Sequence, residues 1–306
     1  MRFLTAGALL IWVAQVSAQD AITLSGWDTL ATLKVGSALA AGPTGLLYVT
    51  DSGNHTVRVF NADGSVVSAF GGPGTAEGQF DAPADVDPTN GLVLVVADLG
   101  NSRIQRFTKT FQLFESIPLY ATGPQRGQIP TPSSPSLELG SVSPLIPGRP
   151  VSLAVSPTNE TFAVDETAGR VARWDASRRF AGFIGDDEGD QVLLAPVAVE
   201  AIGDQVFVAD NGRGEIAVFD TFGSYVRSIG SGLLSNVSSL SAAGRFLLVT
   251  EPDRLVVYSV NGRREGEFRL DLADAAVGAV EIGDQTYVLT RRHLLRAAQT
   301  VTGARR

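Results

Sequence analysis

A short pattern that recurs six times along this chain constrains its fold more than any other feature. In five copies an apolar, β-rich run ends in an acidic residue: Asp51, Asp98, Asp165, Asp210 and Glu251. The sixth copy ends at Thr290 and has lost the acid. Four of the five spacings between these positions lie between 39 and 47 residues, and the other is 67. A repeat of this length is typical of one blade of a β-propeller.

The residues around each anchor predict four short strands per repeat. A second strand follows the anchor and in five copies ends in an aromatic residue: Phe60, Phe107, Trp174, Phe219 and Tyr258. Tight turns rich in glycine and asparagine, such as Asn61–Gly64, lead into a further strand, and an inner strand precedes each anchor. Four antiparallel strands per unit make a propeller blade. We therefore predict an all-β fold, a six-bladed β-propeller of four-stranded antiparallel blades.

The two ends of the chain complement each other. The sixth unit has no fourth strand after His293–Arg296, whereas Leu30–Gly36 near the N-terminus is a strand without a unit. We expect this N-terminal strand to pair with the last blade and close the ring, because an open ring would expose a strand edge. Residues 19–306 then form one domain.

Two segments at blade spacing, residues 51–60 and 98–107, resemble the NHL repeat, whose pattern is an acid followed by asparagine, arginine, an aliphatic and an aromatic residue. The second segment matches with Asp98, Asn101, Arg103, Ile104 and Phe107, and the first with Asp51, Asn54, Val57 and Phe60, but with Thr56 in place of arginine. Later copies keep fewer positions, namely Asp165, Arg170, Trp174, Asp210 and Phe219. The resemblance implies a six-bladed propeller used mainly for recognition, and related propellers include lactonases and lyases.

We assign these motif residues a structural role. The acid and the asparagine are expected to hydrogen-bond backbone amides in the turn, and the arginine to stack on a neighbouring blade. His55 falls inside the motif as a filler, so no catalytic role is expected for it.

The first 18 residues have the features of a secretory signal peptide. Arg2 supplies the positive charge, Phe3–Val16 is apolar, and Val16-Ser17-Ala18 fits a cleavage site after Ala18. The apolar run is shorter than the roughly 20 residues that span a bilayer, although a retained anchor is the alternative. The chain has no cysteine, and disulfide-free exported proteins are commoner in bacteria. We expect a secreted or periplasmic, bacterial protein without an integral membrane segment after signal removal.

Charge and channel composition bear on the kind of partner. The net charge of −8 and the lack of a basic stripe argue against nucleic acid as a partner. At the channel mouth we expect Ser37, Asp85, Ser152, Ala198, Ser239 and Gly278, of which only Asp85 is a carboxylate. Since calcium and zinc sites need several charged or histidine ligands, we expect no catalytic residues, cofactor or metal, and treat Asp85 as a candidate binding residue.

One acidic cluster is a further candidate binding site: Asp186, Asp187, Glu188 and Asp190. Its alternating acids resemble a calcium loop, but no glycine follows Asp190 and no glutamate closes the loop at the expected distance. We favour a solvated acidic turn and keep calcium binding as the alternative.

The extra length between the second and third anchors is a proline-rich insertion at about residues 121–150. Propeller topology places it on the same face as the anchor turns and the acidic cluster. We predict a non-catalytic recognition or scaffold propeller that binds a protein, peptide or glycan on this face. An inert insertion and a metal-dependent lactonase- or lyase-like enzyme are the alternatives.

Overall fold

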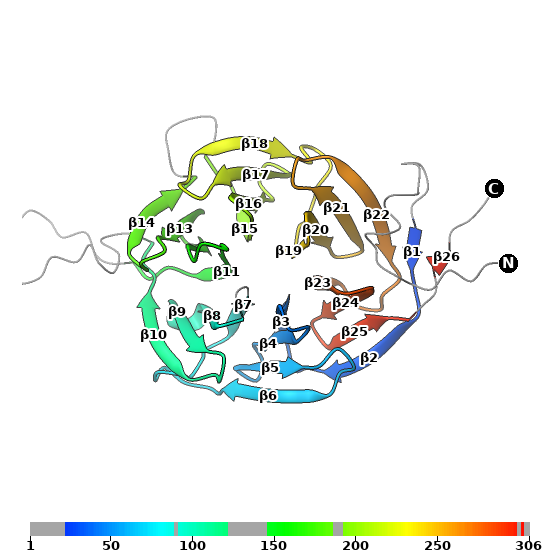
Figure 1. Ribbon diagram of the computed structural model, residues 1–306, viewed down its shortest axis with the longest axis horizontal. Coiled ribbons are helices and arrows are strands. Elements are labelled where there is room, and N and C mark those ends of the chain that lie inside the picture. The colour runs from blue at the N-terminus through cyan, green and yellow to red at the C-terminus, as the bar shows by residue number, and fades with distance from the viewer. Residues whose placement is uncertain (1–21, 89–90, 122–145, 186–191, 299–300, 303–306) are drawn as a thin grey trace, which may run out of the picture.

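The computed structural model describes residues 22–88, 91–121, 146–185, 192–298 and 301–302. These residues form a ring of six β-sheets around a central axis (Figure 1). The predicted fold is confirmed: the structure is an all-β, six-bladed propeller whose blades have four antiparallel strands each. The expected signal segment, most of the proline-rich insertion and the acidic cluster lie outside the described residues.

The first three blades follow one another along the chain, each running from the inner strand at the axis to the outer strand at the rim. Blade 1 consists of β3 (Gly36–Ala41), β4 (Leu47–Asp51), β5 (Thr56–Phe60) and β6 (Val66–Gly71). Blade 2 consists of β7 (Pro83–Asp87), β8 (Val93–Asp98), β9 (Arg103–Thr108) and β10 (Leu113–Pro118), with a short 3₁₀ turn, η1 (Leu99–Asn101), after the anchor. Blade 3 consists of β11 (Pro150–Val155), β12 (Thr161–Asp165), β13 (Arg170–Trp174) and β14 (Phe180–Ile184).

The remaining blades complete the ring. Blade 4 consists of β15 (Pro196–Ile202), β16 (Gln205–Asp210), β17 (Glu215–Asp220) and β18 (Tyr225–Ile229). Blade 5 consists of β19 (Ser239–Ala243), β20 (Phe246–Glu251), β21 (Arg254–Ser259) and β22 (Arg264–Leu270). Blade 6 consists of β23 (Ala276–Ile282), β24 (Gln285–Thr290), β25 (His293–Ala297) and β2 (Trp27–Thr32).

The N-terminal strand closes the ring as predicted, but with shifted bounds. β2 spans residues 27–32 and pairs antiparallel with β25, from Trp27 opposite Ala297 to Thr32 opposite His293. Residues 33–35 instead connect β2 to β3, and Leu33 is buried there. Gly36 already belongs to the inner strand of blade 1, where an added Cβ would lie 2.8 Å from the Thr290 carbonyl oxygen.

A second N-terminal strand adds to blade 5, which the sequence analysis did not predict. β1 (Ile22–Leu24) pairs in parallel with β22, and β26 (Val301–Thr302) pairs with β1, so this sheet has six strands. Ile22 and Leu24 are buried against Phe268 and Leu270. β1 and β26 therefore lie together at the outer edge of blade 5 (Figure 1).

The core lies between adjacent blades. The five motif aromatics are almost completely buried: Phe60, Phe107, Trp174, Phe219 and Tyr258. Each aliphatic core cluster joins strands of two blades, as where Leu39 and Val49 of blade 1 pack with Val280 and Leu289 of blade 6. The ring is therefore held by burial of apolar surface at every junction.

The two ends of the ring differ in what they carry. The connections between blades are residues 33–35, 72–82, 119–149, 185–195, 230–238 and 271–275, and their described residues lie at the end named here the loop face. The opposite end, the hairpin face, carries the turns between the inner and second strands of each blade. No helix among the described parts of the chain is long and apolar enough to cross a membrane.

Candidate functional site

The motif acids hold the loop face together. Each buried carboxylate accepts backbone N–H groups from the connection that precedes its own blade, at residues 15–17 positions earlier in the chain. Asp51 accepts from Lys34 and Val35, Asp98 from Asp81, Asp165 from Arg149, Asp210 from Leu194 and Ala195, and Glu251 from Ser235 and Asn236. The hydrogen bonds predicted between the acids and backbone amides therefore exist, but most of them reach the interblade connection and not only the motif turn. The asparagines act differently from the prediction, because Asn54 and Asn101 donate to the carboxylates of Asp51 and Asp98. Such charge-assisted bonds are stronger than neutral ones.

An arginine beside four of these acids binds the same connections through their carbonyl oxygens. Arg103 donates to Thr75, Ala76 and Gln79, Arg170 to Ala121, Arg213 to Val192, and Arg254 to Leu233. In each of these blades the acid accepts hydrogen bonds from backbone N–H groups of the connection, and the arginine donates hydrogen bonds to its carbonyl oxygens. We call this pair of residues a loop grip. We expected the motif arginine to stack on a neighbouring blade. Arg103 does not do so, because its guanidinium donates hydrogen bonds to backbone carbonyl oxygens. Arg170 does lie over an aromatic ring, that of Phe183 in its own blade, 3.3 Å from the centroid.

Loop grips occur where the connections are long. The four blades that have one follow the connections 72–82, 119–149, 185–195 and 230–238. The two short connections, 33–35 and 271–275, precede blades 1 and 6, where Thr56 and Thr290 replace motif residues. A short connection has few backbone N–H and C=O groups that need a side-chain partner. Loss of the arginine or the acid therefore leaves few of these groups without a hydrogen bond.

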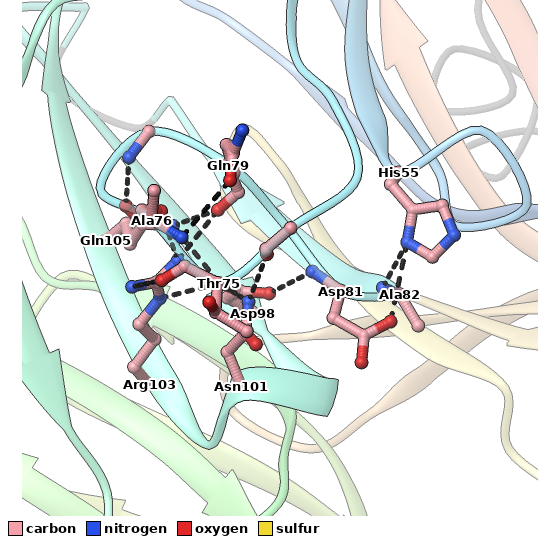
Figure 2. A network of polar contacts seen from close by, with 12 residues as sticks. His55, Thr75, Ala76, Gln79, Asp81, Ala82, Asp98, Asn101, Arg103 and Gln105 are labelled. Atoms are coloured by element: carbon pink, nitrogen blue, oxygen red, sulfur yellow. Dashed lines mark hydrogen bonds and ion pairs between the residues drawn. The ribbon is translucent and has the colours of Figure 1, made fainter.

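The grip on the connection 72–82 is the most complete (Figure 2). Arg103 Nε donates to Asp98 Oδ2 at 2.7 Å, and its two terminal nitrogens reach the three loop carbonyls at 2.8–2.9 Å. Asn101 Nδ2 donates to the same carboxylate at 2.8 Å, and Gln105 both donates to the Gln79 carbonyl oxygen and accepts from Gly78 N–H. Despite these bonds, the tip residues 75–77 are exposed.

His55 belongs to this structural network. Its Nδ1 accepts a hydrogen bond from the Ala82 backbone N–H at 3.0 Å and lies 3.5 Å from Asp81 Oδ1 (Figure 2). Its backbone has φ of +56°, which matches a turn position. The geometry agrees with a structural motif residue.

The base of the proline-rich insertion is held at both of its described ends. Asp165 accepts from Arg149 N–H, and Arg170 donates to the Ala121 carbonyl oxygen, each at 2.8–2.9 Å. Ala121 N–H also donates to the Ile146 carbonyl oxygen at 2.8 Å, and Tyr120 bridges to Pro147. The described ends of the insertion are therefore paired with each other and held at the loop face, and we call this paired base the stem.

A cavity of about 310 Å³ lies on the ring axis, lined by residues of all six inner strands. Its lining reaches Gly42, Pro43 and Pro88 at the hairpin turns, which places it toward the hairpin face, opposite the long connections. Four carboxyl side chains line it: Asp85, Asp87, Glu200 and Glu281. Among the described residues of this lining there is no lysine, arginine or histidine.

Two of these acids connect neighbouring blades. Asp85 Oδ2 accepts from Leu153 N–H at 2.8 Å and Asp87 Oδ2 from Val155 N–H at 2.6 Å, both from blade 2 to blade 3. In blade 3 the neutral Ser152 makes the equivalent interblade hydrogen bond, because its hydroxyl oxygen accepts from Val199 N–H of blade 4 at 3.2 Å. The candidate binding residue Asp85 therefore lies in the cavity but already has an interblade partner.

Glu200 makes the equivalent link from blade 4 to blade 5. Its Oε2 accepts from Ala242 N–H at 3.0 Å and its Oε1 from Ala201 N–H at 2.8 Å. Burial, together with the negative charge of Asp87, raises the pKa of Glu200 to about 8. Burial likewise raises the pKa of Asp85 to about 6.

Glu281 differs from the other three acids because neither of its carboxyl oxygens has a hydrogen-bond partner among the described residues, although both atoms are buried. Burial raises its pKa to about 7. Buried polar atoms in native proteins are usually paired, so this side chain is the exceptional group of the cavity.

Three of the four cavity acids were not predicted from the sequence. The prediction took one position per inner strand, whereas the cavity lies further along the strands, at Asp87, Glu200 and Glu281. Strand alternation contained a signal for two of them. Asp87 lies two residues after Asp85, and Glu200 occupies the same register in blade 4, opposite Phe207 as Asp87 is opposite Val95. Glu281 lies one position further along its strand, opposite Thr286. Within the described part of the chain, no group of three or more metal-ligating side chains converges. Asp186, Asp187, Glu188 and Asp190 lie outside that part.

Comparison with known proteins supports the fold. The NHL repeat model matches residues 37–60, which include the first motif segment. No curated protein matches the chain in sequence.

Solved structures of similar shape include two lyases. Virginiamycin B lyase from Staphylococcus aureus is 13% identical, with a TM-score of 0.58 over 90% of this chain and 98% of that one. A streptogramin B lyase is 10% identical, with a TM-score of 0.58 over 93% and 87%. Hydrazine synthase from Kuenenia stuttgartiensis is 14% identical, with a TM-score of 0.56 over 85% and 74%. At these identities the likeness concerns the fold alone.

Proposed function

We propose that this protein is an exported bacterial recognition propeller that binds a protein, peptide or glycan partner on its loop face. The observation that carries the proposal is the set of four loop grips, which hold the four longest connections on one face of the ring. Binding residues are commonly found on loops positioned by a rigid scaffold.

The energetic advantage lies in the rigidity of the loops. Ordering a loop on binding reduces affinity, so a loop already fixed by a buried acid and an arginine gives up less entropy. The connection 72–82 illustrates this arrangement, because Arg103 holds its backbone while Thr75, Ala76 and Glu77 are exposed to a partner. The fixed stem of the proline-rich insertion adds a second presented element on this face.

Site-specific photo-crosslinking in the native cells tests the proposal. A photoreactive amino acid placed at Glu77 lies on the loop face, and the same group at Asp284 lies on the hairpin face; both positions are exposed. We expect a discrete crosslinked partner from position 77 and none from position 284. Crosslinking at 284 alone, or at neither position, would contradict the proposed face.

One deletion variant tests the insertion, and one measurement on the unaltered protein tests export. Deletion of Gly127–Gly140 should leave folding intact while weakening the crosslink, if the insertion contributes to binding. Sequencing the N-terminus of the mature protein tests export, with Gln19 expected as the first residue.

A metal-dependent, lactonase- or lyase-like enzyme is the second candidate function. The observation in its favour is the cavity, where the raised pKa values of Glu200 and Glu281 suit general acid or base catalysis near neutral pH. Metal analysis of the purified mature protein is the first test, since a stoichiometric, tightly held ion would favour the enzyme. For the acidic cluster, calcium titration heat that disappears in Asp186→Ala and Asp190→Ala would show an ion site.

A further inference from the structure

Two exposed phenylalanine rings lie on either side of blade 3, at the hairpin face. Antiparallel pairing places the turn between the third and fourth strands of a blade at this end of the ring. Phe222 lies in such a turn of blade 4 and is 77% exposed, the highest value among the large apolar side chains that the structure describes. Phe114, at the start of β10 in blade 2, is 43% exposed. Single exposed rings are common on protein surfaces, so the surrounding residues decide what such a ring can bind.

Blade 3 places an arginine beside each of these rings. The guanidinium carbon of Arg173 lies 5.8 Å from the centre of the Phe222 ring, and that of Arg178 lies 5.9 Å from the centre of the Phe114 ring. One blade therefore reaches both of its neighbours with the same combination, a cation next to an exposed aromatic ring. We call these four residues the phenylalanine–arginine strip.

Both arginines are positioned by contacts within the protein. Arg173 Nε donates a hydrogen bond to the Thr221 carbonyl oxygen at 2.6 Å. Arg178 Nη1 lies 3.6 Å from Glu115 Oε2, and the same oxygen accepts a hydrogen bond from the buried Arg106 at 3.3 Å. Side chains that are already ordered lose less conformational entropy when a ligand binds. The strip is therefore prepared for a ligand that meets both guanidinium groups.

The charges around the strip favour an anionic ligand. Of the nearby carboxylates, Glu160 accepts hydrogen bonds from hydroxyl groups of its own turn, and Asp175 accepts from the Arg179 backbone N–H at 2.9 Å. The side chains of Arg179 and of Lys109, in the corresponding turn of blade 2, are exposed and form no ion pair with another described residue. Cationic side chains are thus exposed here in a protein of net charge −8, and charge complementarity selects an acidic partner.

We propose that the phenylalanine–arginine strip binds an acidic oligosaccharide, whose sugar rings stack on Phe114 and Phe222 and whose carboxylates pair with Arg173 and Arg178. A pyranose ring has an apolar face of C–H groups that fits an aromatic ring, and a uronate adds one carboxylate to each sugar. The same pair of contacts occurs twice, as a ligand with a repeating unit requires. The site goes beyond the proposed function, because it lies on the hairpin face and not on the loop face.

A membrane surface fits the strip less well. Membrane binding grows with the apolar area that enters the lipid, whereas the two rings belong to blades on opposite sides of blade 3. The turn between them, residues 176–179, is exposed and carries Arg178 and Arg179. The alternation of ring and cation matches a uronate chain better than a continuous apolar layer.

The test titrates the mature protein, monitored by NMR, with hexamers of galacturonate and mannuronate and with a hyaluronate hexasaccharide. Maltohexaose is the neutral sugar of similar length, and hexaglutamate is an acid without sugar rings. We expect saturable shifts at residues 173–179 and 222 with at least one acidic oligosaccharide, and roughly tenfold weaker binding of the two comparison ligands.

Two variants and one control connect binding to the strip. Phe222→Ser and Arg178→Gln should each weaken binding about fivefold, because each removes one of the paired contacts. Arg245→Gln is the matched control: Arg245 is also exposed and lies 5.2 Å from the centre of the Phe246 ring, but in blade 5 and beside a ring that packs against the core. This variant should bind as the wild type does.

Four outcomes would overturn the proposal: no saturable binding of any acidic oligosaccharide, equal binding of maltohexaose or hexaglutamate, shifts confined to other parts of the ring, or unchanged binding by both strip variants. Phosphatidylglycerol vesicles that bind the protein through Phe222, without oligosaccharide binding, would also contradict it and indicate a membrane surface. If a strip variant does not fold, the position of the shifts in the wild-type protein decides. The crosslinking at Glu77 does not depend on this result, so failure of either proposal is recognised separately.

Discussion

Arg103 Nε donates a hydrogen bond to the buried Asp98 carboxylate at 2.7 Å, while the rest of the same guanidinium holds three carbonyl oxygens of the connection from blade 1. One side chain thus joins the anchor of one blade to the loop that leads into that blade. The Asp98 side chain has no exposed surface and that of Arg103 is only 12% exposed, so solvent does little to weaken the pair. Loop order and blade stability are therefore coupled.

Replacing Arg103 tests this coupling. Arg103→Ala leaves the Asp98 carboxylate and the loop carbonyls short of donors, and we expect a loss of about 2–4 kcal/mol in the free energy of unfolding, since an unsatisfied charged partner costs more than an ordinary hydrogen bond. Urea unfolding measures the loss. Hydrogen exchange should become faster at residues 72–82. Arg269→Ala, at an exposed position on β22, is the control and should change neither quantity.

The motif acids should contribute much more to the free energy of unfolding than acids in ordinary turns do. Asp210 is fully buried and accepts from Leu194, Ala195 and Gly212 N–H. Asp210→Asn places an amide group against these donors, so we expect a loss of roughly 2–5 kcal/mol, as for other broken buried charge interactions. Asp220→Asn, in a more exposed turn where the acid accepts from Phe222 and Ser224 N–H, should cost less than about 1 kcal/mol. Similar losses for both variants would contradict the structural role of the anchor.

The cavity acids predict how stability depends on pH. The pKa values of Glu200, about 8, and Glu281, about 7, lie above the value of about 4.3 expected in the unfolded chain. Between these values the folded protein holds protons that the unfolded chain has released, so their contribution makes the free energy of unfolding fall as pH rises from about 5 to 8. Urea unfolding at pH 5.5 and pH 8 measures the difference.

Glu281→Gln should reduce that difference, because the variant has no titrating group at this site, whereas Asp284→Asn should leave it unchanged. A pH dependence that is identical in wild type and Glu281→Gln would show that Glu281 does not hold its proton in the folded state.

Alanine variants of two adjacent glycines distinguish the effect of side-chain crowding from the effect of backbone strain. Gly71 and Gly72 have φ of +99° and +119°, a region that disfavours other residues. An added Cβ at Gly71 would lie 2.4 Å from the Phe80 ring, but at Gly72 it would contact nothing within 4 Å. Gly71→Ala should therefore lower the midpoint of thermal unfolding clearly more than Gly72→Ala does. Equal midpoints would mean that the Phe80 ring moves aside at little cost.

The ring of blades could be predicted from the sequence alone. Repeat spacing, alternating apolar residues and turn glycines are local properties, and they predicted six four-stranded blades and an N-terminal strand that completes the last one. The anchors Asp51, Asp98, Asp165 and Asp210 were also recognisable as structural residues, because their motif repeats at blade spacing. In contrast, β1 spans only three residues, too few to show a period, and its parallel pairing with β22 depends on where blade 5 lies in space.

The hydrogen-bond partners of the buried polar groups became known only from the folded structure. The partners of an anchor lie 15–17 residues earlier in the chain, on a connection whose path the motif does not encode. Glu200 and Glu281 are unremarkable in the sequence, since each is a single acid in an apolar inner strand. Closing the ring brings both residues to the lining of one cavity. There Glu200 accepts from the Ala242 amide, whereas the Glu281 carboxyl oxygens are buried without a partner among the described residues. The reason is physical: strand periodicity is set by neighbouring residues, whereas burial and pairing of a charge depend on which other blades surround it.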